Sequence, residues 1–126
     1  MINHLLDTNV IIMLFRGDRQ AKQFVSTISQ LGEVSISVVT RAEILAGMKL
    51  AEEKTTRVLL NSFTNVPVDS AIADQAGKLI YAQARQGFQL TFPDALIAAT
   101  ALLDSLTIVT TNVKHFSFAN LSVRAF

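Results

Sequence analysis

The feature that most constrains the fold is a regular alternation of short apolar, strand-like runs with longer stretches of helical periodicity. The strand-like runs are rich in Leu, Ile and Val, and Asp18 and Asp69 are suited to cap two of the helices. Strands that alternate with helices are typical of α/β domains, in which helices flank a central, mainly parallel sheet. We expect strands at residues 3–6, 34–38, 66–68, 106–109 and 121–124, and helices at residues 9–15, 19–31, 40–48, 52–63, 70–84 and 92–103.

The chain is expected to form one domain that spans residues 1–126, because no linker rich in Pro, Gly or Ser divides it. Half of its residues are hydrophobic, which is enough to build a core at this length. The apolar run at residues 95–103 is far shorter than the roughly 20 residues that span a bilayer. The N-terminus also lacks the basic start and the cleavage site of a signal peptide. We therefore expect a cytoplasmic protein with no membrane segment.

The inventory of side chains excludes several kinds of site. The chain has no cysteine, which excludes a disulfide framework, a zinc–thiolate site and a cysteine nucleophile. It has two histidines, too few for a histidine-rich zinc site, so a metal would be held by oxygens, which suit Mg²⁺, Mn²⁺ or Ca²⁺. The net charge of +1 lacks the signature of a strong DNA binder, but it is compatible with a nuclease whose basic residues are local.

Three acidic residues stand where predicted strands hand over to predicted helices. Asp7 follows the first strand, while Glu43 and Asp94 are expected in the first turns of the helices after residues 34–38 and near residue 92. Ligands bind at the carboxyl ends of the strands in parallel α/β sheets, so the three acids are expected at one edge. A cluster of three carboxylates needs a cation, and oxygen ligands of this kind suit Mg²⁺.

Each acid taken alone also has a purely structural explanation. Asp7 could be the N-cap of a helix, and residues 40–43 (TRAE) have the pattern of a capping box in which Glu43 bonds back to the cap. Residues 91–94 (TFPD) fit a looser form of the same box, with a proline suited to a first turn. The helix dipole would also stabilise acids at these positions. The shared position of the acids favours a metal site over three separate caps.

Four segments of the sequence stand out in order along the chain: residues 5–10 (LLDTNV), 37–47 (SVVTRAEILAG), 93–101 (PDALIAATA) and 108–116 (IVTTNVKHF). The first three contain the acids, and the fourth closes the series. In order and spacing these segments resemble the motifs of PIN domains, and among these the chain is most similar to VapC-type toxins of toxin–antitoxin pairs. The resemblance covers the whole chain.

The resemblance implies a metal-dependent endoribonuclease that cleaves RNA phosphodiester bonds, with Mg²⁺ or Mn²⁺ held by the three acids. It assigns catalytic and metal-binding roles to Asp7, Glu43 and Asp94, and supporting roles to the polar residues Thr8, Asn9, Thr110 and Asn112. The chain departs from the family in its last segment, where many members carry a fourth acid. Asn112 and His115 hold the candidate positions, which predicts a weaker or absent second metal site.

Two basic residues beside the acidic motifs, Arg41 and Lys114, are candidates for contacts to substrate phosphates, although both could equally be ordinary surface residues. Arg16, Arg19 and Lys22 form a further basic group that reads as a solvated face. The resemblance also implies a VapB-like antitoxin that covers the site, with a basic side chain among the carboxylates, and a homodimer. The RNA target stays open at this point.

Other classes of protein compete with this interpretation. A phospho-acceptor signalling domain needs paired acids after its first strand, and a haloacid-dehalogenase-like phosphatase needs a second Asp where Asn9 stands. Two alternatives lie closer: a catalytically silent PIN module that binds RNA or protein, which the missing fourth acid favours, and a housekeeping PIN nuclease that processes RNA.

Overall fold

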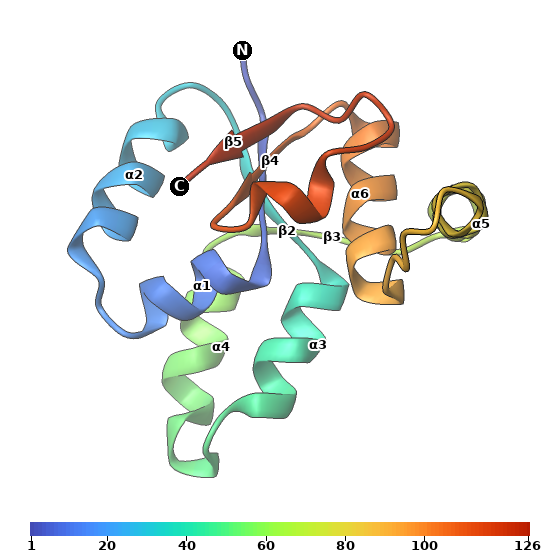
Figure 1. Ribbon diagram of the computed structural model, residues 1–126. Helices are drawn as coiled ribbons and strands as arrows, with labels where there is room; N and C mark the ends of the chain where they lie inside the picture. The colour runs from blue at the N-terminus through green and yellow to red at the C-terminus, as the bar shows by residue number, and fades with distance from the viewer.

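A five-stranded sheet forms the centre of the protein, and every pair of neighbouring strands in it is parallel (Figure 1). The computed structural model describes all 126 residues. The strand order is β3-β2-β1-β4-β5, so that β1 lies in the middle. The strands are β1 (His4–Leu6), β2 (Val34–Ser37), β3 (Thr64–Val66), β4 (Thr107–Thr110) and β5 (Val123–Ala125).

Helices cover both faces of this sheet, which confirms the predicted α/β class. The helices are α1 (Thr8–Phe15), α2 (Arg19–Ser29), α3 (Val38–Gly47), α4 (Glu53–Asn61), α5 (Ser70–Arg85) and α6 (Phe92–Asp104), with 3₁₀ turns η1 (Leu50–Glu52) and η2 (Val113–Phe116). Figure 1 shows α3 and α4 as an antiparallel pair beside α1, with α6 next to α3 and α5 packed on the outer side of α6. No helix is both long enough and apolar enough to cross a membrane.

The hydrophobic core has two parts, one on each face of the sheet. Leu5 belongs to the larger part, which α5 and α6 cover, and its neighbour Leu6 belongs to the smaller part with residues of α1 and α2. Successive residues of a strand point to opposite faces, so the fully buried β1 contributes to both. Burial on both faces explains why the successive residues Leu5 and Leu6 are both apolar rather than alternating between apolar and polar.

The structure corrects several predicted boundaries by one to three residues. Strand β2 ends at Ser37 and α3 begins at Val38, because the Ser37 side chain caps the helix by accepting a hydrogen bond from the Val39 amide (3.0 Å). Strand β3 ends before Pro67, whose nitrogen has no proton to donate to a neighbouring strand. The last strand is residues 123–125 rather than 121–124, and the predicted helix at 52–63 is a 3₁₀ turn followed by α4.

Candidate metal centre at the carboxyl edge of the sheet

The carboxyl ends of β2, β1 and β4 lie side by side, and the first acid follows the central one of these strands. Asp7 is 8% exposed and is the N-cap of α1, as its structural explanation predicted. Its Oδ1 accepts a hydrogen bond from the Thr8 amide (2.8 Å). Its Oδ2 accepts one from the Thr110 hydroxyl at the end of β4 (2.8 Å). A cap needs only one oxygen, so the second bond serves to fix the carboxylate itself.

The second acid is not part of a capping box, and the prediction that it lies in a first turn is wrong. Since α3 begins at Val38, Glu43 lies in its second turn, and Thr40 is a buried helical residue rather than a cap. The Glu43 carboxylate is exposed and accepts a hydrogen bond from the Thr8 hydroxyl (2.8 Å), which also lies 3.1 Å from the Thr40 hydroxyl. Glu43 is thereby held toward α1, the helix that Asp7 begins.

The third acid begins α6, where the predicted cap is present. Thr91 is the N-cap, and its hydroxyl accepts a hydrogen bond from the Asp94 amide (3.4 Å). The pKa of Asp94 is raised, first by burial and then by the negative charge of Asp7, with a smaller contribution from Glu43. His115 and the Thr91 hydrogen bond oppose this shift. The three acids therefore share one electrostatic environment, although they come from three distant segments.

The last motif brings a histidine to the acids in the place of a fourth carboxylate. The Nδ1 atom of His115 lies 3.6 Å from Oδ2 of Asp94, and its Nε2 lies 3.1 Å from Nδ2 of Asn112. The backbone amide of Asn112 in turn donates a hydrogen bond to the Thr110 hydroxyl (3.0 Å), the group that holds Asp7. This link between His115 and Asp94 was not predicted, because a charge-based reading of the motif looks for an acid.

The predicted substrate-binding residues lie apart from these contacts. One guanidinium nitrogen of Arg41 donates to the side-chain oxygens of Asn61 (2.9 Å) and Asn65 (3.1 Å), which ties α3 to α4 and β3. Lys114 is exposed on η2, and substrate-binding roles for Arg41 and Lys114 stay predictions. Asn9, which was predicted to support the site, is exposed on α1, and that role also stays a prediction. Thr40, which contacts Thr8, belongs with the supporting residues; its spacing of three from Glu43 was the available signal.

The donor set of the site suits a hard divalent cation. Asp7, Glu43 and Asp94 supply only carboxylate oxygens, and none of them forms an ion pair with a Lys or Arg side chain. Burial, followed by the negative charges of Asp7 and Glu43, raises the pKa of Asp94, and a cation bound among the three carboxylates would oppose both effects. The carboxylates do not yet converge on a point, since no three acidic or histidine side chains form a group ready to hold an ion. A cation would have to draw them together.

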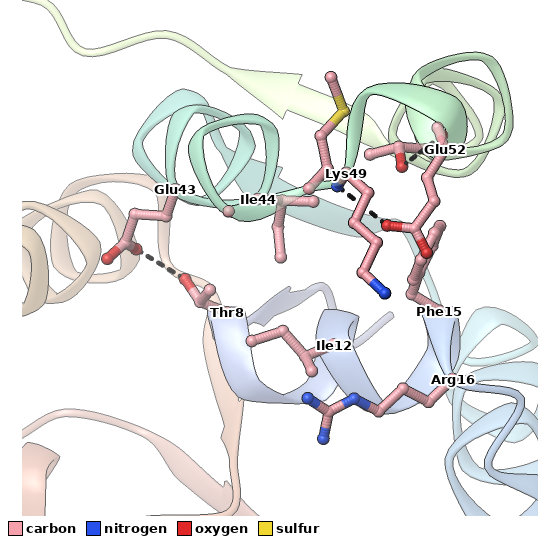
Figure 2. A pocket seen from close by; sticks show the side chains of 11 residues that line it. Thr8, Ile12, Phe15, Arg16, Glu43, Ile44, Lys49 and Glu52 are labelled. Atoms are coloured by element: carbon pink, nitrogen blue, oxygen red, sulfur yellow. Dashed lines mark hydrogen bonds between the residues drawn. The ribbon is translucent and has the colours of Figure 1, made fainter.

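A groove leads away from this cluster between α1 on one side and α3, η1 and α4 on the other. Its volume is about 470 Å³, and Thr8 and Glu43 lie at one end of it. Figure 2 shows these two residues joined by their hydrogen bond, with Ile12 and Ile44 facing each other beyond them. The groove therefore opens directly onto the candidate metal site.

Comparisons with known proteins agree with this architecture. The family model described as "PIN domain" matches residues 4–121. Ribonuclease VapC10 of Mycobacterium tuberculosis is 37% identical over 112 residues, which cover 89% of this chain and 84% of the relative.

Two solved structures are similar over nearly the whole chain. A toxin–antitoxin complex from Klebsiella pneumoniae has a chain that is 35% identical with a TM-score of 0.78, covering 96% of this chain and 95% of that one. VapBC2 from Rickettsia felis, bound to a DNA fragment from its promoter, has a TM-score of 0.90 at 20% identity and 99% coverage of both chains, which shows the shared fold. The chain therefore belongs to the PIN domain family and, within that family, to the VapC group.

Proposed function

We propose that this protein is an endoribonuclease that depends on Mg²⁺ or Mn²⁺ and acts as the toxin of a toxin–antitoxin pair in the cytoplasm. The observation that carries the proposal is the cluster of Asp7, Glu43 and Asp94, none of which forms an ion pair with a Lys or Arg side chain. Burial, followed by the negative charges of Asp7 and Glu43, raises the pKa of Asp94 within this cluster. The family supports it, because a relative at 37% identity is named a ribonuclease and a similar solved structure is a toxin–antitoxin complex.

The three carboxylates would hold the metal, which supplies a water of lowered pKa and stabilises negative charge on the phosphate. The remaining side chains position these ligands. The Thr110 hydroxyl holds Asp7 by donating a hydrogen bond to its Oδ2, and the Thr8 hydroxyl holds Glu43 by donating one to its carboxylate. Metal sites depend on such hydrogen bonds to their ligands, and losing one typically costs about 10- to 100-fold in affinity or activity.

The substrate is proposed to enter beside these ligands, with its phosphates near the exposed side chains of the last motif. Lys114 supplies a positive charge on η2, and Asn112 offers a neutral oxygen where other members carry an acid. Arg41 needs to leave Asn61 and Asn65 before it can contact RNA, so we place it second to Lys114. Asn9, exposed on α1 two residues after Asp7, is a further candidate for a polar contact to substrate.

The experiment that tests the nuclease is a cleavage assay on total cellular RNA with purified protein. We expect cleavage with Mg²⁺ or Mn²⁺, loss of cleavage in excess EDTA, and loss in Asp7→Asn and Asp94→Asn. Asp74→Asn serves as the matched control, because Asp74 is exposed on α5, away from the acids. Cleavage that persists in EDTA, or equal activity of all three variants, would refute the proposal.

A catalytically silent module that binds RNA or protein is the second candidate, and the uncharged Asn112 in the last motif favours it. Metal binding and RNA cleavage separate the two. The toxin role is tested by inspecting the gene's neighbourhood for a small reading frame and by expressing the chain in bacteria with and without that frame. We expect arrested growth that this frame relieves, and a homodimer of the free chain by light scattering. Unimpaired growth with full RNA cleavage would instead favour a housekeeping nuclease.

A further inference from the structure

A histidine lies at the candidate metal centre, and the proposed nuclease chemistry leaves it without a role. Nδ1 of His115 lies 3.6 Å from Oδ2 of Asp94. This separation is longer than the roughly 2.7–3.2 Å of a hydrogen bond between nitrogen and oxygen. About half of the side-chain surface of His115 is exposed, so an ion from solvent can reach the ring. The ring nitrogen therefore faces the carboxylate without being bonded to it.

The turn that carries this histidine is anchored to the site by its neighbours. Turn η2 packs against α6, the helix of Asp94, and Phe116 is buried in the larger part of the core. Asn112 is the N-cap of η2, and side chains three residues apart in a 3₁₀ turn lie one above the other. The Asn112 side chain consequently lies beside the ring, with Nδ2 3.1 Å from Nε2 of His115. The fold thus holds the backbone of His115 beside Asp94.

The separation of the two side chains suits a shared ion. Two atoms that bind one ion at about 2.1 Å lie about 3.0 Å apart at a right angle and about 3.4 Å apart at a tetrahedral angle. The 3.6 Å between Nδ1 of His115 and Oδ2 of Asp94 exceeds these values only slightly. Imidazole is also a common metal ligand in proteins. A small movement of either side chain would therefore let both bind the same ion.

The Asn112 amide can support the histidine as a ligand. A histidine that binds a metal through one ring nitrogen usually donates the proton of the other to a neighbouring acceptor. In the structure the Nδ2 group of Asn112 faces Nε2 of His115. A half-turn of this amide brings its Oδ1 to the ring instead, where it accepts the Nε2 proton and leaves Nδ1 free to bind an ion. Asn112 can thus serve the metal-free and the metal-bound forms of the ring.

We propose that His115 is a nitrogen ligand of the metal together with Asp94, and that the site therefore prefers Mn²⁺, Co²⁺ or Ni²⁺ to Mg²⁺. Mg²⁺ favours oxygen ligands, whereas imidazole nitrogen suits transition ions, whose affinity generally rises from Mn²⁺ to Co²⁺ to Ni²⁺. Neither His115 nor Asn112 adds a carboxylate, so the last motif contributes no anionic oxygen for Mg²⁺. This inference rests on the proposed metal site of the three acids.

A purely structural role for His115 makes the opposite prediction. A protonated ring at 3.6 Å would form an ion pair with Asp94 and compete with a cation for the carboxylate. Removing such a partner would free Asp94 and strengthen the binding of every divalent ion. Removing a nitrogen ligand weakens the binding of transition ions and leaves Mg²⁺ unaffected. The effect of one substitution on several ions therefore separates the two roles.

The test is pulsed electron paramagnetic resonance of Mn²⁺ bound to the full chain at neutral pH, which detects a nitrogen nucleus bonded to the ion. We expect a nitrogen signal in the wild-type protein that is lost in His115→Ala. The matched control is His4→Leu, which should keep the signal, because His4 is the only other histidine and is buried at the start of β1.

Calorimetric titrations of the same proteins measure the preference between ions. His115→Ala should bind Mn²⁺ and Ni²⁺ at least about tenfold more weakly, as expected when a metal site loses a partner, with no change for Mg²⁺. His4→Leu should bind all three ions like the wild-type chain. His115→Asp, which exchanges the nitrogen for a carboxylate, should lose the nitrogen signal and bind Mg²⁺ more tightly. Circular dichroism establishes that each variant is folded.

Three results would overturn the proposal: no nitrogen signal in wild type, a signal that persists in His115→Ala, or Mn²⁺ affinity that is unchanged or higher in that variant. If Mn²⁺ binding depends on Asp94 but shows no nitrogen signal, the site of the three acids stands and only the role of His115 fails. If no ion binds to wild type, both fail. If wild type shows the nitrogen signal but cleaves no RNA, the ligand assignment stands and the proposed nuclease fails.

Discussion

The hydrogen bond from Thr110 to Asp7 joins residues that are 103 positions apart, and removing it gives the most quantitative prediction. The Thr110 side chain is fully buried, and its hydroxyl donates a hydrogen bond to Oδ2 of Asp7 (2.8 Å). The same hydroxyl accepts a hydrogen bond from the backbone amide of Asn112 (3.0 Å). Thr110→Val keeps the shape of the side chain but deletes the hydroxyl. It leaves a buried carboxylate oxygen and a backbone amide without their partners.

The expected cost follows from these two bonds. A hydrogen bond to a charged group contributes about 1.5–3 kcal/mol, and one between neutral groups about 1 kcal/mol. We therefore expect Thr110→Val to lower the free energy of unfolding by about 3 kcal/mol. With an unfolding entropy of about 2.1 cal/mol/K per residue, this corresponds to a fall of about 10 °C in Tm.

The assay is urea unfolding in a double-mutant cycle with Asp7→Ala. Once Asp7 is absent, Thr110→Val should cost only about 1 kcal/mol, so the coupling energy between the two residues is about 2 kcal/mol. Thr110→Ser, which keeps the hydroxyl, should retain most of this coupling. A stability of Thr110→Val equal to wild type, or the same loss with and without Asp7, would refute the reasoning.

Three further perturbations have defined directions. Both ring nitrogens of His4 are buried without hydrogen-bond partners. Burial, followed by the charge of Arg124, lowers the pKa of His4 below 6.5, so the unfolded chain binds more protons than the folded chain. The free energy of unfolding should therefore fall as the pH drops below 6.5 in the wild-type chain, but not in His4→Leu. Gly32→Ala should destabilise the fold by about 1–3 kcal/mol in thermal unfolding, because its Cβ would overlap the Ile2 carbonyl. Asp94→Asn should raise Tm in EDTA at neutral pH, since it removes a carboxylate whose pKa is raised.

Part of the site could be predicted because Asp7 directly follows an apolar strand and Asp94 lies in the first turn of a capped helix, and both features are visible in the local sequence. The apolar run before Asp7 and the TFPD start of α6 are local signals, and the structure bears out both positions. Because β1, β2 and β4 are parallel, their carboxyl ends lie at one edge of the sheet, as the alternation of strands and helices predicted.

The start of α3 was misplaced because the sequence offers two capping residues, Ser37 and Thr40, only three positions apart. The pairing of β2 with β3 includes Ser37, so the strand extends to that residue and the helix must begin directly after it. The partners of Arg41 could not be predicted either, because Asn61 and Asn65 approach it only when α4 and β3 pack against α3. Local patterns carry no information on such contacts.

The most direct test of the central claim is a calorimetric titration of the metal-free protein with Mn²⁺, since the claim is that the three acids form a metal site. The account predicts saturable binding by the wild-type chain, the same binding by the control Asp74→Asn, and a loss of at least about tenfold in affinity for Asp94→Asn. Identical isotherms for wild type and Asp94→Asn, with both proteins folded, would contradict the assignment of the site.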